Sequence, residues 1–582
     1  MATLGRAGTE PVASLREALR RCRQSFVAAG LVSFCINILI LAPMIYMMQV
    51  YDRVMTSGSL STLAMLTVLL TFLLLVMGTL EWVRSQILIV TSNRLDQVLG
   101  SRVFDAMFTS ALPGAGRAAT AQPLNDLLQL RQFLSGPGLF AFFDAPWLPL
   151  NIVIMWWFHW TYGVAALLSA FILVGLNLFN EVATRDMLRD ANDAAMASAS
   201  QTQRNLRNIE AIEAMGMLHR LRRRWLDQQN DMLHLQAGAS SRAGLIGATS
   251  KLYRTLIQSL ILGLGAYLAI DKQISPGAMI AGSMLLGRAL APLDLLIGSW
   301  KGFVGARDAY QRLDNLLRAV PLQPPPMSLP APTGRIQLEN VAIVPPGSQA
   351  PIIAGVSLVI EAGQQVAIIG PSAAGKSTLV RAMLGLYRPA TGSVRIDGGD
   401  IGQWSRAELG QYLGYLPQDV ELLDGTIGEN IARFGDVDAE QVVAAARLAG
   451  IHEMLLRLPQ GYDTVIEGQG AVLSAGQRQR IGLARALYAL PRIVILDEPN
   501  SNLDQEGEQA LGLALAGLRQ QGSTVVMVTH RPGILQRVDS IAFMNAGQLA
   551  AYGPRERVLQ AIHQATTTQG AATPAMAPST PR

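Results

Sequence analysis

The residues best suited to chemistry lie between positions 370 and 378, which read Gly-Pro-Ser-Ala-Ala-Gly-Lys-Ser-Thr. Glycines at positions 370 and 375 allow the backbone to curl so that successive N–H groups point at one anionic ligand. Lys376 places a compact charge where the outer phosphates of ATP would lie, and the hydroxyl of Ser377 suits Mg²⁺. The pattern predicts a phosphate-binding loop made of Gly370, Pro371, Ser372, Ala373, Ala374, Gly375, Lys376, Ser377 and Thr378.

The flanking segments have the secondary structure that a phosphate loop requires. Residues 365–369 form a short apolar run typical of a buried parallel strand, and residues 378–384 have helical character. A glycine-rich turn without a ligand is the alternative interpretation. A strand, a loop and a helix in the correct order favour the phosphate site.

Further strand-like runs end in residues that suit phosphate hydrolysis. The run at 492–496 leads into Asp497, which suits the Mg²⁺ shell, and Glu498, which suits polarising the attacking water. The run at 523–529 leads to His530, placed to contact the terminal phosphate. Gln418 follows a third run and is a candidate for the metal and water shell. The spacing allows the acid pair to follow a strand that neighbours the phosphate-loop strand.

The rest of the chain is too apolar for a soluble protein. Hydrophobic residues make up 50% of the 582 positions and charged residues 15%, against about 25% in an ordinary soluble domain. Six stretches of near 20 residues are long enough to cross about 30 Å of hydrocarbon. These predicted spans are residues 27–48, 62–83, 138–157, 160–180, 252–271 and 276–298.

The distribution of arginine predicts the orientation in the membrane. Arg6, Arg16, Arg20, Arg21 and Arg23 precede the first span, which places the N-terminus in the cytoplasm. An even number of spans returns the chain to the cytoplasm, where ATP is available. The net charge of +5 is explained by these flanking arginines, so we do not expect nucleic acid as a partner.

The connections between spans alternate in length and divide the chain into segments. Residues 84–137 and 181–251 are long and polar, and they predict cytoplasmic hairpins. The second hairpin contains a cluster of four arginines, Arg220, Arg222, Arg223 and Arg224. The cluster is either a basic face that contacts solvent or lipid headgroups, or a surface that contacts the ATPase domain or the substrate. The predicted segments are an N-terminal segment 1–26, a membrane domain 27–319, a proline-rich linker 320–334, an ATPase domain 335–560 and a disordered tail 561–582.

One further segment carries a family resemblance. Residues 473–480 read Leu-Ser-Ala-Gly-Gln-Arg-Gln-Arg, and with the phosphate loop, Gln418, the acid pair and His530 in this order, residues 335–560 resemble the ATPase domain of ABC transporters. The resemblance implies a six-span α-helical membrane domain of the ABC exporter type fused to an α/β P-loop nucleotide-binding domain. It also implies two ATPase domains stacked head to tail, so the working unit is expected to be a homodimer. Each ATP would then lie against Ser474, Ala475, Gly476 and Gln477 of the second copy.

Two positions depart from the family pattern. Family members usually have glycine where this chain has Ala475, and we expect function to survive the small methyl group. The aromatic residue that normally stacks on adenine is missing, and Ile343 or Val344 is expected to take its place by apolar contact.

The membrane half is similar to the inner-membrane ATPase of bacterial type I secretion systems, in the metalloprotease and lipase exporter branch. The matching segments are residues 49–54, 142–147, 210–217 and 287–292. The resemblance implies export of an unfolded polypeptide with a C-terminal signal, together with a periplasmic adaptor and an outer-membrane channel. A lipid or small-molecule exporter, and a membrane scaffold or channel that does not transport, are the alternatives.

Arg288 requires a physical explanation because it lies near mid-membrane. It falls about 12 residues, or roughly 18 Å, into the sixth predicted span. A charge at that depth costs about 2.5 to 3.5 kcal/mol on insertion scales, so we expect it to face the transport pathway or a partner. Asp294 is about 240° away around the helix and cannot pair with it. Asp144 is either its partner or a residue near the cytoplasmic interface.

Overall fold

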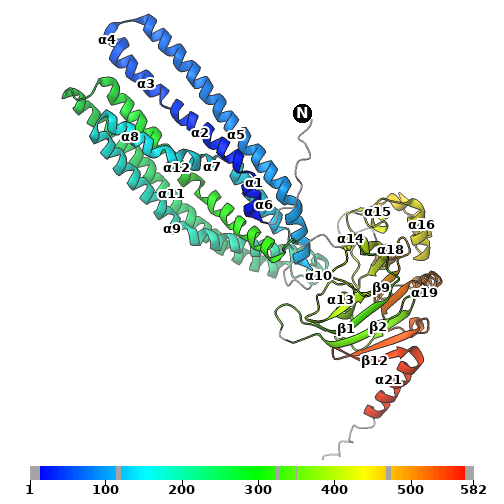
Figure 1. Ribbon diagram of the computed structural model, residues 1–582. Helices are drawn as coiled ribbons and strands as arrows, with labels where there is room; N and C mark the ends of the chain where they lie inside the picture. The colour runs from blue at the N-terminus through cyan, green and yellow to red at the C-terminus, as the bar shows by residue number, and fades with distance from the viewer. Residues whose placement is uncertain (1–13, 113–119, 323–327, 349, 467–472, 571–582) are drawn as a thin grey trace, which may run out of the picture. The chain divides into compact units, whose positions relative to one another are not determined.

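The computed structural model describes residues 14–112, 120–322, 328–348, 350–466 and 473–570 (Figure 1). The chain divides into two compact units, and the change from one to the other in the linker lies between Pro321 and Leu322. The first unit contains only helices, and the second contains the β-sheets.

The first unit is built from long helices joined by short turns. Within the described residues, six helical segments are long and apolar enough to cross a membrane, and each overlaps one predicted span. The prediction of six spans is therefore confirmed. The helices are α1 (Leu15–Arg21), α2 (Arg23–Leu39), α3 (Ala42–Gln49), a π-helical turn (Val50–Val54), α4 (Met55–Ser57), α5 (Leu60–Ala111), α6 (Gln122–Ser135), α7 (Pro137–Asp144), a 3-10 turn (Ala145–Trp147), α8 (Leu148–Phe158), α9 (Trp160–Leu206), α10 (Ile209–Ala214), α11 (Leu218–Ile270) and α12 (Pro276–Ala319).

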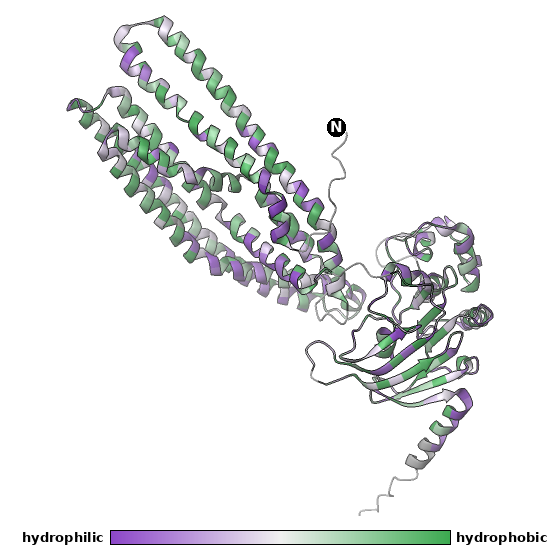
Figure 2. Cartoon of the chain, viewed as in Figure 1, coloured by the Kyte–Doolittle hydropathy of each residue, from purple (hydrophilic) through white to green (hydrophobic). Residues whose placement is uncertain are grey.

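Four of these helices are much longer than a membrane span, and one of them is α12 with 44 residues. Helices α5, α9 and α11 contain 52, 47 and 53 residues, whereas about 20 suffice to cross the hydrocarbon. Their apolar parts therefore continue into polar helix, and the predicted hairpins are extensions of the spans. Figure 2 shows this change along α9 and α11, where hydrophilic residues become more frequent toward α10.

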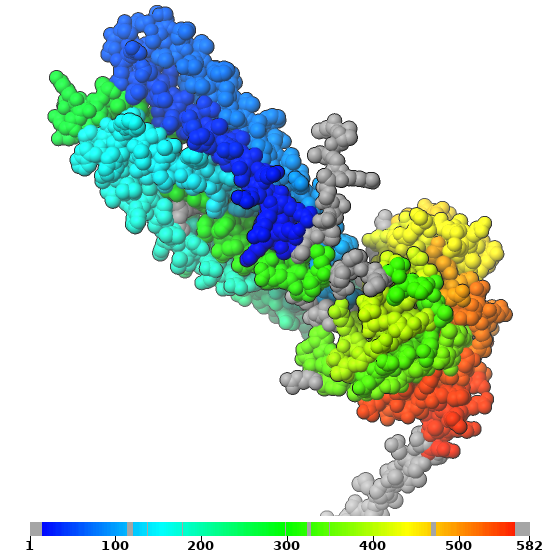
Figure 3. Space-filling view, in the orientation of Figure 1, coloured from blue at the N-terminus to red at the C-terminus, as the bar shows by residue number. Residues whose placement is uncertain are grey.

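Two apolar cores and a polar cluster hold the first unit together. One core joins α8, α9, α11 and α12, and the other packs α1 onto α5, α6 and α12. The polar cluster surrounds Arg84 of α5, which is 6% exposed and donates hydrogen bonds to Ser33 of α2 (3.1 Å) and Asp144 of α7 (2.9 Å). Figure 3 shows α1 to α3 lying along α5.

The second unit contains a six-stranded sheet in the order β12-β11-β3-β10-β9-β6, a four-stranded antiparallel sheet in the order β2-β1-β4-β5, and the β7-β8 pair. In the larger sheet only β12 runs antiparallel to its neighbour. The strands are β1 (Ile336–Ile343), β2 (Ile353–Ile360), β3 (Gln365–Ile369), β4 (Thr391–Ile396), β5 (Gly399–Asp400), β6 (Leu413–Leu416), β7 (Gly425–Thr426), β8 (Val465–Ile466), β9 (Ile493–Asp497), β10 (Thr524–Val528), β11 (Ser540–Asn545) and β12 (Gln548–Pro554).

Helices flank these strands, as parallel sheets require. They are α13 (Lys376–Met383), α14 (Arg406–Tyr412), α15 (Ile427–Ile431), α16 (Ala439–Leu448), α17 (His452–Leu456), a 3-10 turn (Gly461–Asp463), α18 (Ala475–Leu487), α19 (Gln505–Gln520), α20 (Pro532–Leu535) and α21 (Arg555–Gly570). Strands β9 and β10 are fully buried, which explains their continuous apolar sequences.

Two expectations about this unit are wrong. The acid pair does not follow the neighbour of the phosphate-loop strand, because β10 lies between β3 and β9. The tail is not disordered from residue 561, because α21 continues to Gly570. Val558 and Leu559 pack against the core, which anchors this helix. Residues 571–582 lie outside the described part of the chain.

Candidate nucleotide site

The loop between β3 and α13 has the backbone that a phosphate cradle needs. Gly370 and Gly375 have φ angles of 153° and 92°, which L-residues rarely adopt. A Cβ atom at position 370 would also lie 2.1 Å from the carbonyl oxygen of Met544. The two glycines are therefore required by conformation, as the sequence predicted.

Lys376 lies over this loop at the start of α13. Its Nζ donates hydrogen bonds to the carbonyl oxygens of Gly370 (2.9 Å) and Pro371 (2.8 Å), and the residue is 7% exposed. Burial lowers the pKa of Lys376, while the nearby carboxylates of Glu498 and Asp497 act in the opposite direction. The ammonium group is thus held at the position where phosphate oxygens would replace the two carbonyls.

Ser377 and Asp497 form an oxygen pair of the kind that Mg²⁺ prefers. The Ser377 hydroxyl donates to Oδ1 of Asp497 over 3.3 Å, and Asp497 is 1% exposed at the end of β9. Burial is the largest cause of the raised pKa of Asp497, and Glu498 adds to it. A divalent cation bound by this hydroxyl and carboxylate would compensate the buried charge. The residues present therefore fit the metal.

Gln418, Glu498 and His530 come together at the carboxyl ends of neighbouring parallel strands. The Gln418 side-chain amide donates to Oε2 of Glu498 over 3.3 Å, and Nε2 of His530 lies 3.8 Å from Oε1 of Glu498. The φ angle of Glu498 is 49°, a strained value for a residue with a Cβ. Its backbone N–H bonds the carbonyl oxygen of Val528, which holds this conformation (3.1 Å).

The structure does not support Ile343 as a base-contacting residue. Ile343 is 1% exposed and belongs to the apolar core beneath β1. The next residue, Val344, lies directly after the end of β1. Val344 is 37% exposed, so it is the available apolar contact for a nucleotide base in this segment.

Residues 473–480 begin a helix with a capped N-terminus. Ser474 Oγ accepts a hydrogen bond from the backbone N–H of Gln477 (3.2 Å), and Gln477 Oε1 accepts one from the N–H of Ser474 (2.8 Å). This capping box leaves the positive end of α18 accessible to an anion. Ala475 is exposed, whereas a Cβ at Gly476 would lie 2.8 Å from the carbonyl oxygen of Asn502.

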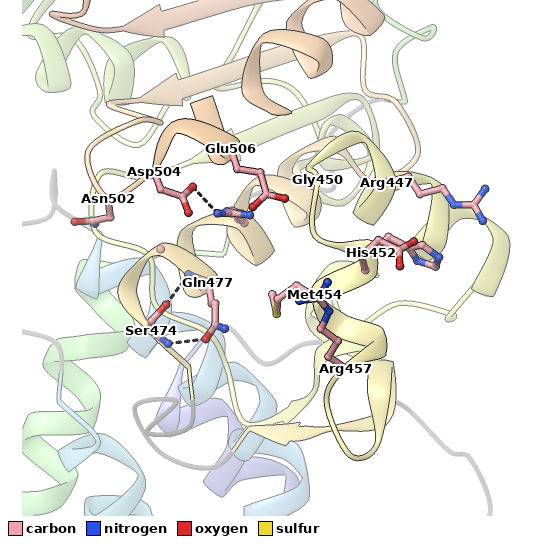
Figure 4. Close-up of a pocket in the computed structure, with 13 residues that line it drawn as sticks. Arg447, Gly450, His452, Met454, Arg457, Ser474, Gln477, Asn502, Asp504 and Glu506 are labelled. Carbon is pink, nitrogen blue, oxygen red and sulfur yellow. Dashed lines mark hydrogen bonds and ion pairs between the residues drawn. The ribbon is translucent and has the colours of Figure 1, made fainter. Parts of the chain in front are cut away.

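The start of α18 lines a pocket of about 790 Å³, shown in Figure 4. Ser474, Gly476 and Gln477 form one wall, and residues of α16, α17 and the segment before α19 form the others. Among the described residues, none from the phosphate loop lines this pocket. One chain thus presents the phosphate loop and the α18 N-terminus as separate surfaces.

Gln479 connects α18 to the acid pair, a role that the sequence analysis did not find. This residue is 2% exposed, and its Nε2 donates to the carbonyl oxygens of Glu498 (3.2 Å) and Pro499 (2.7 Å). Its Oε1 accepts from the N–H of Asn502 (2.9 Å). A glutamine among the buried positions of an amphipathic helix was the available signal, because a buried amide needs partners.

Asp144, one candidate partner of Arg288, pairs with a different arginine. Asp144 pairs with Arg84 and accepts a hydrogen bond from Asn37 (3.0 Å), so it is not the partner of Arg288. Asp294 pairs with Arg254 of α11. Arg288 is exposed on α12. The basic cluster of the second hairpin is also exposed, and its two interpretations both remain predictions.

Comparisons with known proteins agree with this architecture. The ABC transporter family profile matches residues 353–501, and the ABC transporter transmembrane region matches residues 26–293. A type I secretion system ATP-binding protein, PrsD of Rhizobium meliloti (strain 1021), is 42% identical over 96% of each chain. The chain belongs to the ABC transporter family. It combines the membrane and nucleotide-binding domains of this family in one polypeptide and is an ATPase coupled to export.

Other similar ABC transporters support the same assignment. The leukotoxin translocation ATP-binding protein LktB of Mannheimia haemolytica is 30% identical, over 93% of this chain and 77% of LktB. A solved structure of a bacterial Atm1-family ABC exporter with ATP bound has a TM-score of 0.82 and 24% identity. It covers 95% of this chain and 99% of that one, and it shows that the folds agree.

Proposed function

We propose that the protein is the ATP-driven exporter of a type I secretion system in the bacterial inner membrane. It exports an unfolded polypeptide that carries a C-terminal signal, with both of its own termini in the cytoplasm. A periplasmic adaptor and an outer-membrane channel complete the route. The 42% identity to PrsD over nearly the whole chain is the observation that carries this proposal.

Hydrolysis follows from the arrangement of the nucleotide site. Backbone N–H groups of the loop and Lys376 bind the β- and γ-phosphates of ATP. Ser377 and Asp497 would hold Mg²⁺, which would supply positive charge against the phosphate oxygens. Glu498 accepts a hydrogen bond from the attacking water, and Gln418 and His530 position that water and the γ-phosphate.

The separation of the two nucleotide-contacting surfaces supports a homodimer. The phosphate loop and the α18 N-terminus do not share a pocket in the described chain, yet both carry features that bind anions. Two copies related by a two-fold axis can face the phosphate loop of one with the α18 N-terminus of the other. Each dimer then encloses two ATP molecules.

Export into membrane vesicles tests this function. The protein is reconstituted in vesicles with its nucleotide domains outside, and a polypeptide from the same secretion system is added with Mg²⁺ and ATP. The proposal expects protease-protected polypeptide with the wild type and none with Glu498→Gln. If a fluorescent lipid or a small amphiphile is moved and the polypeptide is not, the lipid or small-molecule alternative is correct.

A further inference from the structure

Two exposed basic residues lie on neighbouring helices of the membrane unit. Arg288 lies within the candidate span Pro276–Leu296 of α12, and Lys251 lies on α11 at the edge of the predicted fifth span. Neither side chain makes an ion pair or hydrogen bond with a residue that the structure describes. Asp294, the nearby acid on α12, is already bonded to Arg254 and Ser250. Two positive charges therefore remain uncompensated.

The contacts between α11 and α12 place these charges at similar depths. Ser283 Oγ donates to the carbonyl oxygen of Gln258 over 3.2 Å, and farther along Asp294 pairs with Arg254. Residue numbers thus rise along α12 as they fall along α11, so the two helices are antiparallel (Figure 1). Arg288 lies between Ser283 and Asp294, which places it at the level of Thr255.

Helix α11 exposes two different stripes at this depth. Thr255 and Ser259 follow Lys251 at intervals of one turn, and all three are exposed. Leu252, Leu256 and Leu260 form the second stripe and are 70%, 54% and 56% exposed. Thr255 is about 60° around the helix from Gln258, whereas Leu256 is about 160° away. The polar stripe therefore adjoins α12, and the leucine stripe points away from it.

Arg288 opens to the same side as the polar stripe. Its neighbour Gly287 packs against the Gln258 side chain, which lies 3.0 Å from a Cβ built at position 287. The exposed face of α12, marked by Arg288 and Leu295, lies next to this contact. Thr255 lies beside the Gln258 contact on α11, and Arg288 lies beside the Gly287 contact on α12. Because the two helices are antiparallel, these exposed faces turn toward the same side of the helix pair.

We propose that Arg288, Lys251, Thr255 and Ser259 form a cationic surface that contacts acidic stretches of the exported polypeptide. The inference rests on the proposed function and adds the charge of the cargo. Charged side chains in spans usually face a water-filled path, because lipid does not solvate them. Unpaired cations attract carboxylates. The hydroxyls of Thr255 and Ser259 donate to carbonyl oxygens of α11, and their oxygens can still accept hydrogen bonds from the backbone N–H groups of an extended peptide. In a two-fold dimer the surface carries four cations.

Thiol labelling tests which stripe faces water. In a chain with Cys22 and Cys35 replaced by serine, Thr255→Cys and Leu256→Cys differ by one position at nearly the same depth. The proposal expects a charged, water-soluble thiol reagent to modify position 255 at least about tenfold faster than position 256. Equal rates, or faster reaction at position 256, would overturn the assignment of the two faces.

Binding of charged peptides tests the selectivity. Three Gly-Ser peptides that carry Asp, Asn or Lys at the same positions are titrated against the full-length protein in nanodiscs. The wild type should bind the Asp peptide about tenfold more tightly than the Asn peptide, and Arg288→Gln/Lys251→Gln should lose this difference. Arg288→Glu/Lys251→Glu should prefer the Lys peptide. Lys301→Gln, an exposed charge on α12 beyond the candidate span, should behave as wild type.

The outcomes separate this inference from the proposed function. A preference for the Asp peptide that survives in Arg288→Gln/Lys251→Gln overturns the cationic surface. Equal binding of all three peptides by the wild type overturns charge selectivity and leaves polypeptide export intact. Failure to bind any of the peptides, together with absence of polypeptide export in vesicles, contradicts the proposed function as well.

Discussion

The side-chain amide of Gln479 donates a hydrogen bond to the main-chain carbonyl of Glu498, with 3.2 Å between the two atoms. This bond joins the helix that begins at Ser474 to the residue expected to activate water. The backbone at Glu498 is strained, with a φ angle of 49°, so its position depends on such contacts. Within one chain, this hydrogen bond connects α18 to Glu498.

Replacing Gln479 with methionine should therefore lower the turnover of ATP more than its binding. The change removes the amide, so the carbonyl oxygen of Pro499 and the backbone N–H of Asn502 lose their hydrogen bonds to it, at a cost of about 1 to 3 kcal/mol. We expect kcat to fall about tenfold or more, with KM for ATP changed less than about threefold. Gln441→Met, at an exposed glutamine of α16, is the matched control. A rise in KM at unchanged kcat would show that Gln479 does not position Glu498.

Glu498→Gln and Lys376→Ala should separate hydrolysis from binding. The glutamine variant keeps the shape of the side chain but cannot polarise water, so it should bind ATP and accumulate a nucleotide-closed dimer. The lysine variant removes the charge held over the loop and should weaken ATP binding itself. Equilibrium binding and single-turnover hydrolysis distinguish the two effects. Near-normal turnover by Glu498→Gln would exclude Glu498 as the catalytic residue.

Ala475→Gly should leave ATPase activity equal to or higher than that of the wild type. Ala475 is exposed at the first position of α18, so its methyl group makes little contribution to the core of its own chain. The loss of helix propensity is about 1 kcal/mol and acts only at a helix end. A tenfold loss of kcat, equal to about 1.4 kcal/mol, would reveal a contact made by this methyl group in the closed dimer.

Asp497→Asn should make the stability of the second unit less dependent on pH. Burial raises the pKa of Asp497 in the folded protein above its ordinary value of 3.8. The folded state then binds more protons than the unfolded state, so stability is lost as the pH rises through the folded pKa. Asparagine cannot titrate, so the variant loses this dependence of stability on pH. Thermal melts from about pH 4 to about pH 7 without nucleotide measure the difference.

In the Asp497→Asn variant, ATP binding should also depend much less on Mg²⁺. Without the Asp497 carboxylate, Mg²⁺ should stabilise ATP binding much less, because one of two oxygen ligands is no longer charged. Wild-type protein measured with and without Mg²⁺ is the control. An unchanged Mg²⁺ dependence would place the metal on other residues.

Much of this site could be predicted from the sequence because its parts are local. The glycines, Lys376 and Ser377 are close in the chain. The acid pair lies at the end of β9, and Gln418 lies two residues beyond β6. The order of the strands could not be predicted, since several arrangements satisfy the same apolar runs, and β10 separates β3 from β9. Ile343 was predicted wrongly because the phase of the β1 side chains depends on which face is buried.

The network around Gln479 and the Arg84–Asp144 pair could not be predicted for a different reason. Their partners lie far apart in the sequence. The Arg84 bonds form only when three helices pack together, and the Gln479 bonds form only when α18 packs against the segment after β9. The tail was predicted to be disordered from its composition, yet Val558 and Leu559 provide enough apolar contact to hold α21. Composition alone does not reveal such anchoring.

We expect ATP to be hydrolysed between two copies of this chain to drive export. Mixed dimers of Lys376→Ala and Ser474→Arg chains, purified through two different tags, test it by their export of polypeptide into vesicles. Each variant alone should be inactive. In the mixed dimer one site carries both defects and the other is intact, so we expect export to recover to about a quarter to a half of the wild-type rate. Mixed dimers as inactive as the parents would contradict the account.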